Sequence, residues 1–119
     1  MFLSVANEFG QYLRQLRESK SPTISQETLG EMVGKKKMTI SLIENGKNDP
    51  PQGELLLKIA NALGLDENEK IEFFDLAALP RGAVPNDILD YFNTHSELRN
   101  AIRRAQRKNM PDADWLKMI

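Results

Sequence analysis

The sequence of 119 residues contains no cysteine and a single histidine, His95. Without cysteine the chain forms no disulfide and has no thiol chemistry, which is typical of proteins of the reducing cytoplasm. A zinc site needs three or four donor side chains, so a lone histidine predicts no metal site. The usual nucleophilic and metal-hydrolase sites cannot be assembled from this composition, and we expect a protein that is not an enzyme and uses no cofactor.

Long apolar runs are missing as well. No stretch approaches the ~20 apolar residues that a membrane-spanning helix needs, and the opening residues, MFLSVANEFG, lack the basic residues of a secretory signal. Hydrophobic residues make up 40% of the chain and charged residues 28%, as in ordinary globular proteins. We therefore expect a globular cytoplasmic protein that does not associate with membranes.

The chain also lacks a strong net charge, because 16 basic residues nearly balance 17 acidic ones. Their distribution is uneven. Residues 1–47 contain seven Lys or Arg against five Asp or Glu, residues 48–79 contain two against seven, and residues 80–119 contain seven against five. Two basic segments thus flank an acidic one, and the near-zero total can conceal a basic face.

Apolar residues recur at helical spacing through most of the chain, and no strand pattern of weight is present. Gly34 and the prolines of the loop KNDPPQG interrupt this periodicity at predicted helix ends. Ser25 and Asp66 are N-cap candidates, and Glu69 can complete a capping box with Asp66. The pattern predicts an all-α fold whose first five helices span about 7–18, 26–33, 37–44, 54–64 and 67–79.

The segment PRGAVP, residues 80–85, has the composition of a linker. Beyond it, helices are expected at about 87–92 and 96–108, followed by a last turn that contains Trp115. The predicted division is a first domain at residues 4–79 and a C-terminal helical extension at residues 80–119.

A short helix, Gly34 and a second short helix form the pattern of a helix-turn-helix. In the DNA-binding version the second helix enters the major groove with its N-terminal residues at base edges. Lys35, Lys36 and Lys37 stand where that helix would begin. Their mutual repulsion is a cost to the free protein that a phosphate backbone would relieve. A run of lysines alone is more often an ordinary solvated surface, so DNA contact is favoured only together with the family resemblance of the surrounding segments.

The stretch SQETLGEMVGKKKMTISLIENGK strongly resembles the helix-turn-helix of the phage repressor, Cro and xenobiotic-response-element (XRE) family of regulators. LLLKIANALGL resembles that family's fourth helix, and FGQYLRQLRESK resembles its first. The resemblance covers about residues 7–77 and implies a lambda-repressor-like five-helix domain that binds double-stranded DNA. The chain departs from the family pattern at Gly30, where alanine is usual and where glycine costs about 1 kcal/mol of helix propensity.

The resemblance also assigns roles to residues. Arg17 and Glu44 match a partly buried ion pair between the first and third helices, and Ile40 and Ile43 match the buried side of the third helix. Gln26 matches a residue that holds a phosphate and braces that helix. The full set expected at the DNA is Gln26, Lys36, Lys37, Met38, Thr39, Ser41, Leu42, Asn45 and Lys47. Within this set Met38 and Leu42 could meet thymine methyl groups, and Lys37 could reach a guanine.

The predicted helix 96–108 bears two kinds of side chain. Arg99, Arg103 and Arg107 align one turn apart, either as a solvated basic side or as a second partner-binding or DNA-binding surface. An apolar set needs a partner surface, either on the same chain or on a second copy. The residues expected at a dimer or partner interface are Leu98, Ile102, Trp115 and Ile119.

These observations predict a sequence-specific transcriptional repressor, a homodimer that binds a palindromic operator through the helix 37–44. One alternative is an antitoxin of the HigA type, which would neutralise a small toxin protein and autoregulate its operon. The acidic segment 48–79 leaves room for such a partner. In another alternative the helix-turn-helix is a scaffold without a role at DNA.

Overall fold

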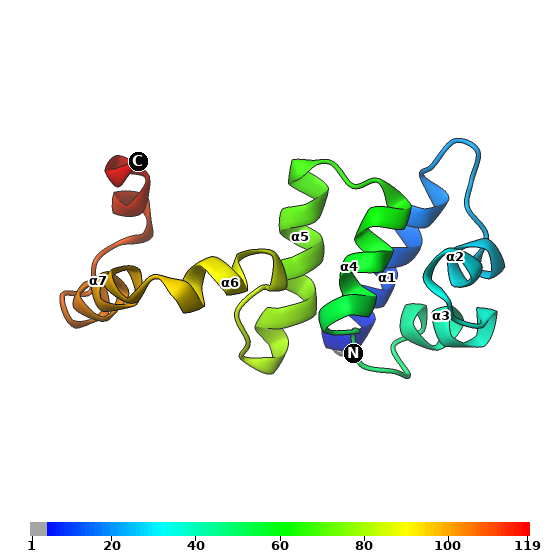
Figure 1. The fold of residues 1–119 in the computed structure, drawn as a ribbon, viewed down its shortest axis with the longest axis horizontal. Coiled ribbons are helices and arrows are strands. Elements are labelled where there is room, and N and C mark those ends of the chain that lie inside the picture. The colour runs from blue at the N-terminus through cyan, green and yellow to red at the C-terminus, as the bar shows by residue number, and fades with distance from the viewer. Residues whose placement is uncertain (1–4) are drawn as a thin grey trace. The chain divides into compact units, whose positions relative to one another are not determined.

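The computed structural model describes residues 5–119, which form helices and loops with no strand among them (Figure 1). The elements are α1 Val5–Glu18, α2 Gln26–Val33, α3 Lys37–Glu44, α4 Gly53–Leu63, α5 Glu67–Ala78, the 3-10 helix η1 Leu79–Arg81, α6 Asn86–Thr94, α7 Ser96–Arg107 and the 3-10 helix η2 Asp112–Met118. The predicted all-α fold is confirmed. None of the described helices is long and apolar enough to cross a membrane.

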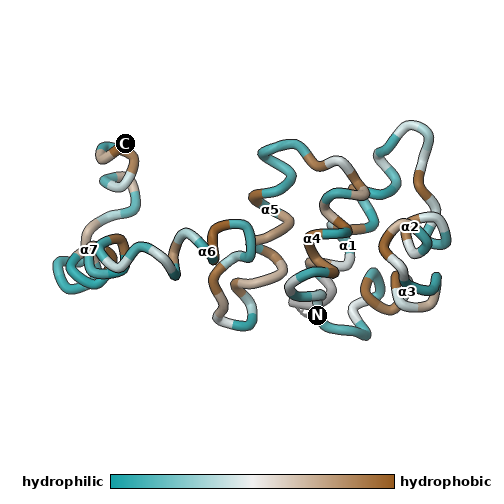
Figure 2. The backbone as a smooth tube through the Cα atoms, viewed as in Figure 1, coloured by the Kyte–Doolittle hydropathy of each residue, from teal (hydrophilic) through white to brown (hydrophobic). Residues whose placement is uncertain are grey.

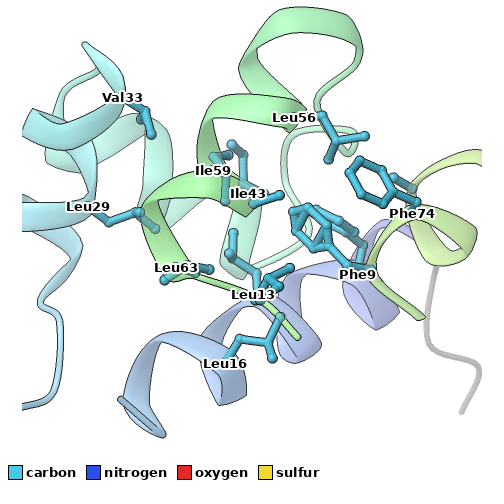
Figure 3. Close-up of a cluster of buried hydrophobic side chains, with 14 of the residues drawn as sticks. Phe9, Leu13, Leu16, Leu29, Val33, Ile43, Leu56, Ile59, Leu63 and Phe74 are labelled. Carbon is cyan, nitrogen blue, oxygen red and sulfur yellow. The ribbon is translucent and has the colours of Figure 1, made fainter. Parts of the chain in front are cut away.

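The chain divides into two compact units, Met1–Asn86 and Asp87–Ile119. The first unit is held together by apolar side chains from each of α1 to α5, which meet in one cluster (Figure 3). The rings of Phe9 on α1 and Phe73 on α5 lie 5.1 Å apart between centroids, so the two helices pack directly on each other. Phe9, Leu13 and Leu16 of α1 are buried, and so are Ile40 and Ile43, which the resemblance placed on the buried side of the third helix.

Local hydrogen bonds fix the ends of these helices. Oγ of Ser25 accepts a hydrogen bond from the backbone N of Thr28 at 3.0 Å, which caps α2 as expected. Oδ1 of Asp66 accepts from the backbone N of Glu69 at 2.8 Å, and Oε1 of Glu69 accepts from the backbone N of Asp66 at 3.0 Å. This reciprocal pair is the predicted capping box of α5.

The segment after α5 continues in the first unit instead of leaving it at once. Leu79–Arg81 form the 3-10 helix η1, where the sequence suggests the end of a helix and the start of a linker. Nη2 of Arg81 donates to the carbonyl oxygens of Pro50 at 3.2 Å and Pro51 at 3.4 Å. Arg81 therefore ties this turn to the loop that precedes α4.

The second unit contains α6, α7 and η2, and none of its residues is buried. Trp115 lies beside α7, where it lines a shallow hollow with Ile102, Ala105 and Met110. Large apolar side chains stay exposed on this unit, among them Tyr91 with 61% of its surface and Leu116 with 81%. The unit thus has helices with apolar faces but no closed core of its own.

Candidate nucleic-acid interface

The turn between α2 and α3 is closed by backbone hydrogen bonds. Gly34 has a left-handed backbone, and the backbone N of Lys35 donates to the carbonyl oxygen of Gly30 at 2.8 Å. The backbone N of Gly34 donates to the carbonyl oxygen of Glu31 at 3.3 Å, which completes a Schellman motif. A Cβ atom on Gly30 would lie 2.7 Å from the carbonyl oxygen of Lys35. Glycine has no Cβ atom, so the carbonyl oxygen of Lys35 can approach the backbone at position 30 this closely. The turn thus requires glycine there despite the low helix propensity of that residue.

Glu44, the last residue of α3, receives hydrogen bonds from α1 and α2. Oε2 accepts from Nε of Arg17 at 2.7 Å, and Oε1 accepts from Nη2 of Arg17 at 2.9 Å and from Nε2 of Gln26 at 2.9 Å. Nη1 of Arg17 donates in turn to the carbonyl oxygen of Ile24 at 2.9 Å. The ion pair implied by the resemblance is confirmed, and it fixes the C-terminal end of α3 to both preceding helices.

This network determines the charge state of Glu44. Burial alone raises the pKa of its carboxyl group, but hydrogen bonds from Arg17 and Gln26, the Arg17 charge and a hydrogen bond from Arg14 together outweigh burial. The pKa of Glu44 is therefore lowered from its ordinary value. The hydrogen bond from Glu44 raises the pKa of Arg17, although burial acts against it. The pair is ionised near neutral pH and holds α3 through charge-assisted bonds.

The two sides of α3 differ in burial. Ile40 and Ile43 are buried with Glu44 against the core. Met38 is 65% exposed, and Thr39 is half-buried at the edge between the two sides. The side opposite the core is formed by Met38, Ser41, Leu42 and Asn45. These four residues, all of them expected at the DNA, thus share one accessible stripe.

The N-terminal end of α3 is basic and uncompensated. Lys35, Lys36 and Lys37 are exposed, and no ion pair within the described residues involves them. Lys36 occupies the N-cap without a side-chain hydrogen bond, and the first turn of α3 holds no acidic residue. The partial positive charge of the helix start adds to that of the lysines. This end of α3 is suited to an anion.

A helix-turn-helix family model matches residues 13–70 of the chain, which include α2, α3 and α4. Residues 13–70 are a helix-turn-helix domain of the Cro/C1-type, XRE family. The resemblance read from the sequence is confirmed, and this domain implies DNA binding and regulation of transcription. No curated protein and no solved structure matched the chain.

Three of the polar residues expected at the DNA already have partners inside the helix-turn-helix domain. Gln26 donates to Glu44, so its bracing role is visible in the structure. Nδ2 of Asn45 donates to Oγ of Ser41 at 3.3 Å, which couples two residues of the accessible stripe. Lys47 is exposed just beyond α3. Its backbone N donates to the carbonyl oxygen of Leu42 at 3.0 Å, and this bond fixes the chain where it leaves the helix.

Arg14 is a neighbour of this surface that the sequence pattern did not single out. Its Nε lies 3.3 Å from Oε1 of Glu44, and its Nη2 donates to Oδ1 of Asn45 at 3.3 Å. The side chain is 48% exposed, in contrast to Arg17 at 9%. Because Arg14 precedes Arg17 by three residues on α1, helical spacing could have placed both on the face toward α3.

Proposed function

We propose that the protein is a transcriptional repressor that binds a palindromic operator as a homodimer. The proposal rests on the difference between the two sides of α3. One side is buried and fixed through Glu44, and the opposite side presents an accessible stripe that begins at a cluster of unpaired lysines. A rigid helix of this kind can enter a major groove in a defined orientation, as direct readout requires.

The roles within this proposal follow from side-chain chemistry. Lys37 at the helix start is placed for a guanine edge, while Lys36 and Lys47 supply charge to phosphates. Met38 and Leu42 offer apolar atoms to thymine methyl groups, and Thr39, Ser41 and Asn45 offer short hydrogen-bonding groups. Gln26 holds a phosphate through the part of its amide that Glu44 leaves free. Arg14, beside Asn45, adds a further phosphate contact.

The homodimer is supported by the second unit. Its apolar residues, including Leu98, Ile102 and Ile119, retain exposure that a folded helical segment normally covers. Trp115 is half-buried beside α7 and extends this apolar surface. A second copy offers a surface of the same composition, and a twofold contact closes on itself. In this proposal the first unit reads one half-site and the second unit, Asp87–Ile119, joins two copies.

The proposal is tested by binding of the full-length chain to duplex DNA. Duplexes from the region upstream of its own coding sequence are titrated in an electrophoretic shift, with a shuffled duplex of equal length as the control. We expect one duplex with twofold sequence symmetry to bind at least ~1000-fold more tightly than the shuffled one. Selection from a random duplex pool extends the search to other operators. Equal affinity for all duplexes would refute specific repression, and a basic protein that co-purifies at fixed stoichiometry would support the antitoxin alternative.

A further inference from the structure

The helix α7 separates basic from apolar side chains around its axis. Successive residues are about 100° apart in an α-helix. At this spacing Leu98, Ile102 and Ala105 fall on one side, and a cationic set falls on the other. Figure 2 shows α7 as a largely hydrophilic helix with few apolar positions. The side opposite the apolar residues is formed by Arg103, Arg104 and Arg107, with Lys108 at its edge; we call these four residues the α7 basic face.

Arg99 does not belong to the α7 basic face, although its spacing from Arg103 and Arg107 suggests a single row. Its Nη1 donates to the carbonyl oxygens of Phe92 at 2.7 Å and Asn93 at 2.8 Å. These carbonyls lie at the C-terminal end of α6, where backbone acceptors have no partner within the helix. Arg99 therefore joins α6 to α7 and has a structural role.

The four cations of the α7 basic face have no acidic partner among the described residues. All are exposed, and none takes part in an ion pair. Nη1 of Arg103 donates to Oδ1 of Asn100 at 3.0 Å, which leaves its charge uncompensated. Arg103 and Arg107 are four residues apart, as are Arg104 and Lys108, and like charges at this spacing repel. The free protein thus maintains a concentrated positive charge that nothing on its own unit relieves.

Stabilisation of the helix end explains only part of this charge. Cations in the last turn of a helix interact favourably with its dipole, and Arg104 and Arg107 occupy that turn. Arg103 precedes the last turn and is too far from the helix end to interact strongly with the dipole. The partial negative charge of a helix end is about half an elementary charge, which a single cation balances. The composition of the face also argues against a protein partner, because its centre lacks the apolar side chains that protein interfaces bury. The apolar side of α7 points the other way and stays available to a second copy.

We propose that the α7 basic face is a second DNA contact, which binds the phosphate backbone without reading sequence. Arginine forks bind phosphate oxygens in pairs, and cations that neutralise phosphates release counterions. The proposal rests on DNA binding by the helix-turn-helix domain. Once α3 holds a duplex, the tethered second unit meets the backbone at a high effective concentration. The contact adds affinity for operator and random DNA alike.

The test compares two full-length variants that remove equal charge. In the first, Arg103→Gln, Arg104→Gln and Arg107→Gln remove three of the four charges of the face while retaining residues of good helix propensity. In the control, Lys58→Gln, Lys70→Gln and Lys117→Gln remove three lysines that lie within ion-pair distance of Glu54, Glu67 and Asp114. Affinities for the preferred duplex and for a shuffled duplex are measured over a range of salt concentrations.

We expect the first variant to reduce the slope of log K against log salt by about 0.9 for each phosphate that the face no longer neutralises, or about 2 to 3 in total. Affinity should fall by the same factor for both duplexes, at least ~10-fold at low salt, while the control keeps the wild-type slope. A third variant with lysine at the same three positions should retain most of the slope, which a purely structural role for the arginines would not predict.

Two results would overturn the second DNA contact. In one, the variant with glutamine at 103, 104 and 107 binds both duplexes with the wild-type slope. In the other, that variant reduces the slope no more than the control that replaces Lys58, Lys70 and Lys117 by glutamine. If the wild-type chain binds all duplex sequences equally well, the proposed repressor function is refuted. The salt dependence of binding to shuffled DNA, compared between wild type and the glutamine variant, would still decide the role of the α7 basic face. An acidic protein that binds wild type but not the glutamine variant, with an unchanged slope on DNA, would assign the face to a protein partner.

Discussion

Arg17 and Glu44 connect α1 to the end of α3 through two parallel bonds, from Nε to Oε2 at 2.7 Å and from Nη2 to Oε1 at 2.9 Å. The Glu44 side chain is fully buried and the Arg17 side chain is 9% exposed. A two-bonded arginine and carboxylate pair fixes orientation as well as distance. The pair therefore positions the accessible stripe of α3 relative to the rest of the first unit.

Removal of one member of this pair should destabilise the domain. In Glu44→Ala the Arg17 guanidinium stays buried without its counter-ion, and such losses cost about 3–5 kcal/mol. We expect a clear fall in the midpoint of thermal unfolding, followed by circular dichroism. Glu18→Ala is the matched control, because Glu18 is an exposed acid beside Arg14. An unchanged midpoint for Glu44→Ala would mean that the pair contributes nothing to stability.

Acid should weaken the same ion pair. The pKa of Glu44 in the folded chain lies below its ordinary value, so the unfolded chain binds the proton more tightly than the folded one. Ionised Glu44 thus stabilises the fold above its unfolded pKa, and this contribution is lost as pH falls through the folded pKa. Denaturant unfolding of wild type and Glu44→Gln between pH 7 and pH 3 measures it. The difference in unfolding free energy between the two proteins should shrink towards the acid end, and a constant difference would contradict the assignment.

Local sequence signals predicted much of the first unit. Apolar spacing gave the helices, and Ser25 and Asp66 marked helix starts because capping depends on residues only three positions apart. The Arg17–Glu44 pair spans 27 residues and came only from the family resemblance. The hydrogen bonds from Arg14 to Glu44 and Asn45 join residues that are similarly far apart in the sequence. They were not predicted, since periodicity assigns a side chain to a face of a helix but does not identify its partner.

The second unit was predicted less completely for a related reason. Its helices follow from periodicity, but the sequence could not tell Arg99, which caps α6, from Arg103 and Arg107, which face solvent. All three share the same spacing on α7. Only the angle between α6 and α7 brings one of them to the free carbonyls of Phe92 and Asn93. Residue type and spacing do not determine that angle.

Gly10→Ala should displace α3. A Cβ atom on Gly10 would lie 2.5 Å from the carbonyl oxygen of Glu44 and would also clash with that of Ile43. Alanine normally stabilises a helix by about 1 kcal/mol relative to glycine, so the steric effect predicts the opposite sign. We expect lower thermal stability and weaker operator binding, whereas Gln11→Ala at the exposed next position should change neither. A more stable Gly10→Ala protein with full affinity would show that α3 tolerates the shift.

Lys37 and Lys47 should differ in what they contribute to DNA binding. If Lys37 reads a base, Lys37→Ala weakens operator binding by about 1–3 kcal/mol and affects random duplex much less. Lys47→Ala should weaken both duplexes by similar factors, because a phosphate contact carries no sequence information. Parallel titrations of both variants on both duplexes separate the two roles. Equal losses on operator and random duplex for Lys37→Ala would place Lys37 at the backbone instead.

Truncation after Asn86 should leave a folded domain that no longer dimerises. The buried core lies within the first unit, and the Arg81 hydrogen bonds to the loop before α4 are retained. The removed unit has no buried residue, and its apolar side chains can cover one another across a twofold axis. We expect the truncated chain to unfold cooperatively and to have the mass of a monomer by light scattering.

Loss of the dimer should change the affinity of the chain for a full palindrome relative to an isolated half-site. A single domain reads about one half-site, so the truncated chain should bind a full palindrome and an isolated half-site with similar affinity. The full-length chain should prefer the palindrome, because the second half-site is engaged at the effective concentration set by the dimer. Ile102→Asp in the full-length chain tests the interface without truncation, since it places a charge in the apolar stripe of α7. A full-length protein that remains monomeric at tens of micromolar, yet prefers the palindrome, would show that dimerisation occurs only on DNA and not through the free second unit.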